Sequence, residues 1–211
     1  MDIVPSWVFD TVQALLSSLK SVELSTYEHC LRVGELSRLL AKELNFSIYD
    51  QNVVFVAGLL HDIGKMGINK NILLKSTHLD ENEFLIMKHH AVLSEAIIKP
   101  LSNHSFFKDI LPIVRGHHER IDGQGYPDKL SEDNIPTLAK VLTVCDAFDA
   151  MSQTRVYRQG LPLESVFNEM IVCSGKQFQL NYVQAFIKNY PLWIMQMNKD
   201  LSLGFYDRCA A

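Results

Sequence analysis

Apolar residues recur at intervals of three and four along most of this 211-residue chain, which is the spacing of one face of an α-helix. Residues 53–61 are apolar on all sides, as is typical of a helix in the middle of a bundle. No alternating pattern of useful strand length occurs. The sequence therefore predicts an all-α fold, a single-domain helical bundle. The clearest stripes are formed by Val8, Val12, Leu15 and Leu19 and by Val33, Leu36, Leu40 and Leu44.

Further helices are expected along the chain, separated by two long loops. Residues 119–135 contain the turn-forming run Asp122-Gly123-Gln124-Gly125-Tyr126-Pro127, and residues 63–79 contain Gly64 and Gly67. Each loop directly follows a histidine pair or a His-Asp pair, so irregular backbone adjoins side chains that bind metals. The helices are predicted over 80–99, 109–118, 136–152, 162–174 and 180–190.

Composition excludes several classes of protein. Lys and Arg number 20 against 24 Asp and Glu, a net charge of −4, so the chain is not a generally basic binder of polymeric nucleic acid. The longest apolar run, residues 53–60, is far shorter than the roughly 20 residues of a membrane span. The N-terminus lacks the charged segment of a secretory signal, so we expect a cytoplasmic protein. Four cysteines without CxxC spacing indicate reduced, mostly buried thiols.

Several imidazole and carboxylate groups are predicted to face the core, where burial without a partner costs about 1–3 kcal/mol. His29 shares the apolar stripe of the second helix, and Asp146 lies on the apolar face of the 136–152 helix. The pairs His61-Asp62 and His117-His118 end two other apolar segments. Taken singly, each histidine could be an ordinary packed residue. Together they predict that around five helices deliver ligands to one interior region.

This set of ligands suits divalent metals that prefer imidazole and carboxylate, such as iron or manganese. It is not a closed structural zinc site, because no cysteine belongs to it. The candidate ligands exceed what one ion needs. Two ions about 3.5–4 Å apart, bridged by a carboxylate, would activate water and clamp the attacking and leaving oxygens of a phosphoryl centre. The residues therefore predict phosphoester hydrolysis.

A series of motifs follows in a fixed order. His61-Asp62-Ile63-Gly64-Lys65 is followed by the run from His117 to Pro127, and then by Ile135-Pro136, by Asp146 to Met151 and by Arg155-Val156-Tyr157-Arg158. Over roughly residues 22–190 the chain resembles the HD-GYP family, a branch of the HD-domain metal-dependent phosphohydrolases. The resemblance implies an HD-type helical bundle with a long Gly-Tyr-Pro loop. Residues 1–21 would then form an N-terminal amphipathic helix and residues 191–211 a C-terminal extension.

The resemblance also implies a ligand set. Periodicity alone cannot choose between His89 and His90, and only the motif selects His90; we assign His89, His78 and His104 to surface or packing. Some members of the family hold a third ion with a glutamate at the position of Ser25, so two ions are expected here, although Glu28 could contribute. The implied metal ligands are His29, His61, Asp62, His90, His117, His118 and Asp146.

The activity implied is hydrolysis of the phosphodiester bonds of cyclic di-GMP, a bacterial second messenger, to the linear dinucleotide, with further hydrolysis to GMP left open. Asp62 and Lys65 would be the catalytic residues, and Lys65 would also contact a phosphate oxygen. Arg155 and Arg158 would grip the other phosphate, unless they form a solvated helix end. Tyr126 would hydrogen-bond or stack on the ligand, or else anchor its loop.

Two alternatives remain open at this point. The chain could be a non-catalytic module that senses a cyclic dinucleotide or docks a diguanylate cyclase, or it could hydrolyse a different cyclic dinucleotide. The N-terminal helix could pack on the domain or form a homodimer. Asp122 and Asp149 could orient ligating imidazoles or serve only turns and caps. The departures from the family pattern are Asn69-Lys70, Ser76-Thr77, Ser94 and Gln179-Leu180, and none is a ligand.

Overall fold

The structure, a computed structural model, describes residues 4–153 and 159–200, with side chains to residue 195. Within these ranges the chain is helical and has no strand, only the isolated bridges Asp122–Ser131 and Ser174–Phe178. The predicted all-α fold is confirmed. None of the described helices combines the length and apolarity needed to cross a membrane.

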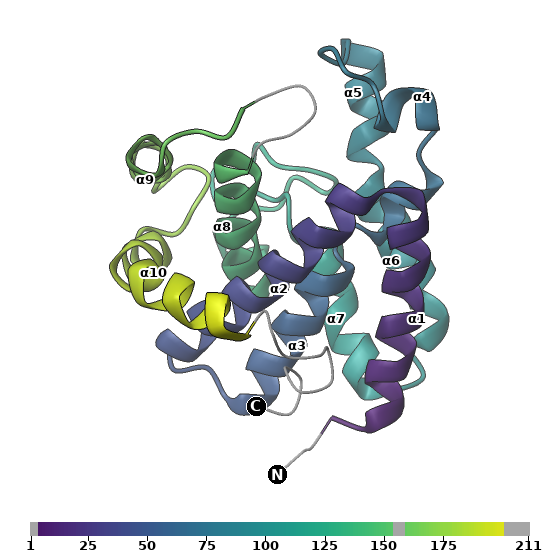
Figure 1. The fold of residues 1–211 in the computed structure, drawn as a ribbon, viewed down its shortest axis with the longest axis horizontal. Coiled ribbons are helices and arrows are strands. Elements are labelled where there is room, and N and C mark those ends of the chain that lie inside the picture. The colour runs from purple at the N-terminus through teal and green to yellow at the C-terminus, as the bar shows by residue number, and fades with distance from the viewer. Residues whose placement is uncertain (1–3, 154–158, 201–211) are drawn as a thin grey trace.

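Three helices form the centre of the bundle and carry about half of its core residues (Figure 1). They are α2 (Leu24–Glu43), α3 (Ile48–Leu60) and α8 (Thr137–Ser152). One side is covered by α1 (Ser6–Val22), α6 (His90–Ile98) and α7 (Ser105–Gly116), and the other by α9 (Leu163–Val172) and α10 (Leu180–Asp200). Short 3-10 turns are Ile63–Gly67, Lys99–Leu101 and Glu132–Asn134, called η1, η2 and η3.

The contact between α2 and α3 explains why α3 is apolar on all sides. A Cβ atom added to Gly58 would lie 2.6 Å from the Cα of Gly34, so the two helices cross at a distance that only glycine permits at this point. Neighbouring helices then bury every face of α3, including Val53, Val56 and Leu60. This close crossing brings the C-terminal end of α3, with His61 and Asp62, beside the middle of α2.

The terminal helices cover the core. In α1, the side chains of Val8, Val12, Leu16 and Leu19 are fully buried against α2 and α3, which is the packing role considered from the sequence. Helix α10 was predicted to end at residue 190, but it continues through Pro191 to Asp200. The buried ring of Trp193 packs edge-on against Phe186, 5.5 Å away, which stabilises this longer helix.

A small hairpin projects from the body of the bundle (Figure 1). It spans residues 68–89 and contains α4 (Lys70–Leu73) and α5 (Glu81–Lys88), neither of which has a buried residue. We call it the α4–α5 hairpin. The single helix predicted over 80–99 is divided at His89 into α5 and α6. The backbone of η1 lies against this junction, since a Cβ atom on Gly64 would be 2.1 Å from the carbonyl oxygen of His90.

Candidate metal centre

The predicted ligands converge on one interior region, although they come from distant parts of the sequence. His29 lies on α2, His61 and Asp62 follow α3, and His90 begins α6. His117 and His118 follow α7, and Asp146 lies on α8. All are buried except His118, whose side chain is 27 % exposed. Among the described residues three groups of three have ligand atoms close enough to hold an ion: His29, His61 and Asp146 as the first, His90, His117 and His118 as the second, and Cys30, His61 and Asp62 as the third.

In the first group, two imidazoles face one carboxylate. The Nε2 atom of His29 is 3.1 Å from Oδ1 of Asp146, and Nε2 of His61 is 3.8 Å from the same oxygen. In the second group, three imidazoles face one another. Nε2 of His90 lies 3.3 Å from Nε2 of His117 and 3.1 Å from Nε2 of His118.

Asp62 lies between the first two groups and directs one oxygen to each. Its Oδ2 atom is 3.4 Å from Nε2 of His61 and 3.6 Å from Nε2 of His29. Its Oδ1 atom is 3.3 Å from Nε2 of His90. A carboxylate placed in this way is in position to bridge two neighbouring cations.

The second nitrogen of most of these histidines already has an acceptor. His61, His90 and His117 each follow the end of a helix, and their Nδ1 atoms donate to the carbonyl three residues earlier, that of Gly58, Met87 or Val114, at 2.6–2.7 Å. These carbonyls belong to helix ends, where backbone oxygens lack partners within the helix. Because a carbonyl only accepts, Nδ1 must carry the proton, and Nε2 presents its lone pair to the site.

This arrangement fits a bound cation. Nε2 of His61 is buried without a hydrogen-bond partner, which is costly unless another group binds there. With Nδ1 protonated, the Nε2 lone pairs of His90 and His117 point at each other across 3.3 Å. A divalent ion would satisfy these atoms, and neutral imidazole with carboxylate is a usual donor set for first-row metals.

The protonation of most of the site agrees with this donor set; His61 differs, because the charge of Asp62 raises its pKa despite burial. Burial, together with the neighbouring imidazoles, holds the pKa of His117 well below its usual range, and burial lowers the pKa of His118 to about 3. Burial alone would raise the pKa of Asp62, but the charges of Lys65 and His61 outweigh it and hold that pKa well below its usual range. Neutral imidazoles and an ionised carboxylate are the forms that bind metal.

A partly buried ion pair orients His29. The Nδ1 atom of His29 donates to Oδ2 of Asp149 at 2.7 Å, and Arg32 donates to both oxygens of this carboxylate at 2.7 and 2.9 Å. Asp149 is thus the orienting residue considered from the sequence. Asp122 instead binds Arg120 and the backbone N–H of Gln124 within its own loop.

Cys30 lies close to the centre but on the other side of His61. Its sulfur is 4.0 Å from Nδ1 of His61, the nitrogen that already donates to Gly58. Burial raises the pKa of the Cys30 thiol, so it stays protonated beside this ring. The sulfur therefore does not share the space that the Nε2 atoms face.

The Gly-Tyr-Pro loop is fixed to the ligand histidines through Glu119. This buried carboxylate accepts from the backbone N–H groups of Asp128 at 2.7 Å and Leu130 at 3.0 Å. A Cβ atom on Gly125 would be 2.5 Å from the Cα of Glu119, so the loop needs glycine here. The Tyr126 ring then stacks on His118, with ring centroids 4.7 Å apart.

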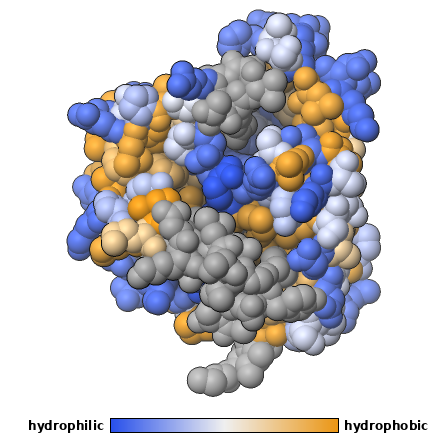
Figure 2. Space-filling model, viewed as in Figure 1, coloured by the Kyte–Doolittle hydropathy of each residue, from blue (hydrophilic) through white to orange (hydrophobic). Residues whose placement is uncertain are grey.

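A pocket of about 580 Å³ opens beside the centre, lined by Lys65, His90, His118 and Tyr126 on the side of the ligands. The α4–α5 hairpin forms the facing wall with Lys75, His78, Phe84 and Met87, among others, and the start of α2 contributes Glu23, Ser25 and Thr26. On the face of the molecule that Figure 2 shows, strongly hydrophilic residues gather at the middle among apolar ones.

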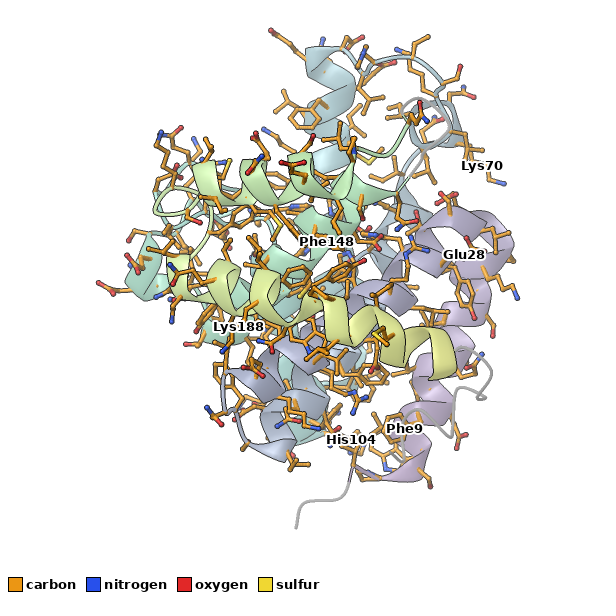
Figure 3. All side chains as sticks on the ribbon, turned by 60° about the vertical axis from the view of Figure 1, so that its left-hand side comes forward. Phe9, Glu28, Lys70, His104, Phe148 and Lys188 are labelled. Carbon is orange, nitrogen blue, oxygen red and sulfur yellow. The ribbon has the colours of Figure 1, made fainter. Side chains whose placement is uncertain are left out.

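Other predicted residues lie apart from the centre or outside the described chain. His89 and His78 are exposed, and the His104 ring lies tilted against Trp7 at the far end of the bundle, with 4.4 Å between the ring centroids. Glu28 is exposed on α2 and belongs to none of the groups that could hold an ion (Figure 3). Arg155 and Arg158 lie outside the described residues.

Comparison with protein families identifies the family of the chain. The family model described as HD domain matches residues 10–179, most of the chain. The chain belongs to the HD domain family. The resemblance stated from the motifs is thereby confirmed, and the matched range begins within α1 and ends just before α10.

Curated relatives and a solved structure extend this assignment of the HD domain. A Thermotoga maritima protein named cyclic di-GMP phosphodiesterase is 38% identical over 182 residues, which cover 86% of this chain and 49% of that protein. A Vibrio cholerae protein named 3'3'-cGAMP-specific phosphodiesterase 3 is 38% identical over 66% of this chain and 30% of its own length. This chain therefore spans about half or less of the length of these relatives.

A solved Vibrio cholerae structure, that of a cyclic GMP-AMP specific phosphodiesterase, has the same fold. It superposes with a TM-score of 0.66 at 16% identity and covers 87% of this chain and 49% of that one. The HD domain fold of the computed model is thus shared with a solved protein of low sequence identity.

Sequence reasoning missed several residues of this HD domain. Glu119 stands next to the ligand pair, but its backbone partners lie nine and eleven residues away in a loop without periodic pattern. Arg32 follows His29 by three residues, which places both on one face of α2, and this spacing was a usable signal. Phe84, which lines the pocket, had no such signal, because α5 buries no residue.

Proposed function

We propose that this HD domain hydrolyses a phosphodiester bond of a cyclic dinucleotide with the help of two divalent metal ions. The observation that carries the proposal is Asp62, whose two oxygens face separate groups of ligand atoms. The names of the relatives, cyclic di-GMP phosphodiesterase and 3'3'-cGAMP-specific phosphodiesterase, support the class of substrate. The pocket beside the centre supports a ligand larger than a single phosphate.

One ion would be held by His29, His61 and Asp146, the other by His90, His117 and His118, and Asp62 would bind both. Such ions, when bound, activate water and neutralise charge on the phosphoryl oxygens. The imidazole-rich donor set favours iron or manganese over magnesium, which prefers oxygen ligands and retains water.

Ser25 supports two ions rather than three. Ser25 lines the pocket at the position where some relatives of the resembled family would place a glutamate. The nearby Glu23 carboxylate accepts from the N–H groups of Ser25 and Thr26 and from the Ser25 hydroxyl, at 2.6–3.0 Å. Glu23 therefore serves the start of α2.

Lys65 and Tyr126 act on the substrate side of the centre. The ammonium of Lys65 donates to Oδ2 of Asp62 at 2.6 Å and lines the pocket, so it can donate to a phosphate oxygen or to the departing oxygen. Burial, with the charges of Asp146 and Asp62, raises the pKa of Tyr126. Its phenol therefore remains a hydrogen-bond donor at neutral pH.

Turnover assays test the proposal directly. Protein loaded with Fe²⁺ or Mn²⁺ is incubated with cyclic di-GMP or with 3'3'-cGAMP, and linear products are separated by chromatography. We expect linear dinucleotide from cyclic di-GMP, and faster turnover of 3'3'-cGAMP would assign the domain to the mixed dinucleotide. Equilibrium binding without turnover at full metal occupancy would contradict the enzyme and favour a sensing module.

A further inference from the structure

Lys88 has surroundings that the proposed metal centre does not explain. It is the last residue of α5 and is half-buried. Its ammonium lies 4.6 Å from the ring centroid of Phe84 and 5.2 Å from that of Tyr126. Both distances are within the range of cation–π attraction, so two ring faces hold the ammonium in place.

The charge of Lys88 has no anionic partner among the described residues. The two lysines that line the nearby pocket differ in this respect, because Lys65 pairs with Asp62 and Lys75 pairs with Glu83. Ring faces attract an ammonium without neutralising it, and the group retains N–H donors for an acceptor. Lys88 therefore places uncompensated positive charge beside Phe84 and Tyr126, next to this pocket.

Both rings beside Lys88 line the pocket. Phe84 is 48 % exposed on α5, which has no buried residue, so core packing does not explain an aromatic residue there. Tyr126 stacks on His118, a candidate metal ligand, at 4.7 Å. The ammonium of Lys88 is thus separated from the metal centre by about one ring, at the edge of the space that a ligand would fill.

We propose that Lys88 binds the phosphate of the cyclic dinucleotide that is not being hydrolysed. The inference rests on the proposed function, which supplies a ligand with two phosphates, and Lys65 beside Asp62 faces the reacting one. Phe84 and Tyr126 fix the ammonium, so little side-chain entropy is lost on binding. From the sequence alone, Arg155 and Arg158 were expected to bind this phosphate. Both lie outside the described residues, whereas the contacts of Lys88 with Phe84 and Tyr126 are described.

The test measures binding and turnover separately. Radiolabelled cyclic di-GMP or 3'3'-cGAMP is bound to metal-free protein in EDTA, and kcat and KM are measured after metal loading. The variants are Lys88→Met, which keeps a long apolar chain, and Lys88→Arg, which keeps the charge. The matched control is Lys70→Met, because Lys70 is exposed at the start of α4 in the same hairpin and its side chain points outward (Figure 3).

We expect Lys88→Met to weaken binding and raise KM by about tenfold or more, since hydrogen bonds to charged groups contribute about 1.5–3 kcal/mol. The value of kcat should stay within about threefold. Lys88→Arg should restore most of the affinity, and Lys70→Met should change nothing. Lys88→Gln serves as a second neutral variant if Lys88→Met is poorly folded.

Unchanged affinity in both neutral variants would overturn the inference, as would equal losses in Lys88→Arg and Lys88→Met, or a loss of bound metal. Wild-type protein that binds the dinucleotide without hydrolysing it would contradict the proposed function. The affinities of wild type and the Lys88 variants would then still decide the inference. Wild-type protein that hydrolyses normally, with Lys88→Met equally active at low substrate, would leave the function standing and remove the inference. Absence of any binding or turnover would remove both.

Discussion

Asp62 and Lys65 are three residues apart and in contact, yet different roles are expected of them, because their atoms face different parts of the site. Asp62 directs one oxygen to each group of ligands, whereas Lys65 reaches it only through Oδ2 and otherwise lines the pocket. We predict that Asp62→Asn loses metal and activity together, because an amide is a weak ligand for two cations. Metal content after dialysis and turnover of cyclic di-GMP measure the two effects.

Lys65→Met should retain metal and lose turnover by about 10²–10³-fold, since a single charged donor to developing oxygen charge contributes on that order. Lys42→Met, an exposed lysine at the far end of α2, is the control and should behave as wild type. Loss of metal in Lys65→Met would show that the ammonium supports the centre rather than the substrate. Retained activity in Asp62→Asn would remove the bridging assignment.

The pair of Asp149 and Arg32 orients a ligand from outside the centre. We predict that Asp149→Asn lowers metal affinity by about 10–100-fold, because outer carboxylates fix the ring and raise the basicity of a ligating histidine. Calorimetric titration with Mn²⁺ measures this affinity. The matched control is Asp122→Asn, which breaks a similar bidentate pair with Arg120 in the loop. Equal affinities in the two variants would contradict the orienting role.

At the scale of elements, the Gly-Tyr-Pro loop depends on one buried carboxylate. Glu119→Gln leaves one acceptor oxygen for two backbone N–H groups and turns an amide donor toward one of them. We predict a loss of about 1–3 kcal/mol in the free energy of unfolding, measured with urea. Glu132→Gln, in the exposed η3 turn of the same loop, should change it by less than about 0.5 kcal/mol. An equal loss in both variants would contradict the anchoring role of Glu119.

The elements also show which features the sequence could predict. Helices with a buried stripe, such as α2 and α8, were predicted because burial imposes the period of the helix. The division between α5 and α6 was not, because it depends on η1 packing against His90 from a distant segment of the chain. Periodicity consequently could not separate His89 from His90, whereas the structure buries only the second.

At the scale of the whole molecule, the convergence of the candidate metal ligands was predictable because they are polar groups on apolar faces. His29 and Asp146 stand on buried stripes where an unpaired polar group would be costly, so their positions alone pointed to one shared site. The pocket wall has no such pattern in the sequence. Its residues on the α4–α5 hairpin are exposed or half-buried, and only the fold places Phe84 opposite the ligand side of the pocket, with the ammonium of Lys88 beside its ring.

The packing of imidazoles in one interior region should also make the metal-free protein sensitive to acid. Burial lowers the pKa of His90, His117 and His118 below that of the unfolded chain, whereas the charge of Asp62 raises that of His61 despite burial. Below about pH 6.5 the unfolded chain then binds more protons than the folded chain at His90, His117 and His118. At His61 the unfolded chain binds no more protons than the folded one. The unfolding free energy must fall as the pH falls through this window, by about 1.4 kcal/mol per pH unit for each excess proton.

Urea unfolding in EDTA between pH 7 and pH 4.5 measures this slope. His117→Asn cannot titrate, so it should reduce the slope by about one proton, whereas His78→Asn, an exposed histidine, should leave it unchanged. Saturating Mn²⁺ should add stability at pH 7, and this increment should shrink toward pH 5 because protons compete for the Nε2 atoms. A slope that is identical in wild type and His117→Asn would mean that His117 titrates in the folded protein, and the buried neutral cluster would have to be abandoned.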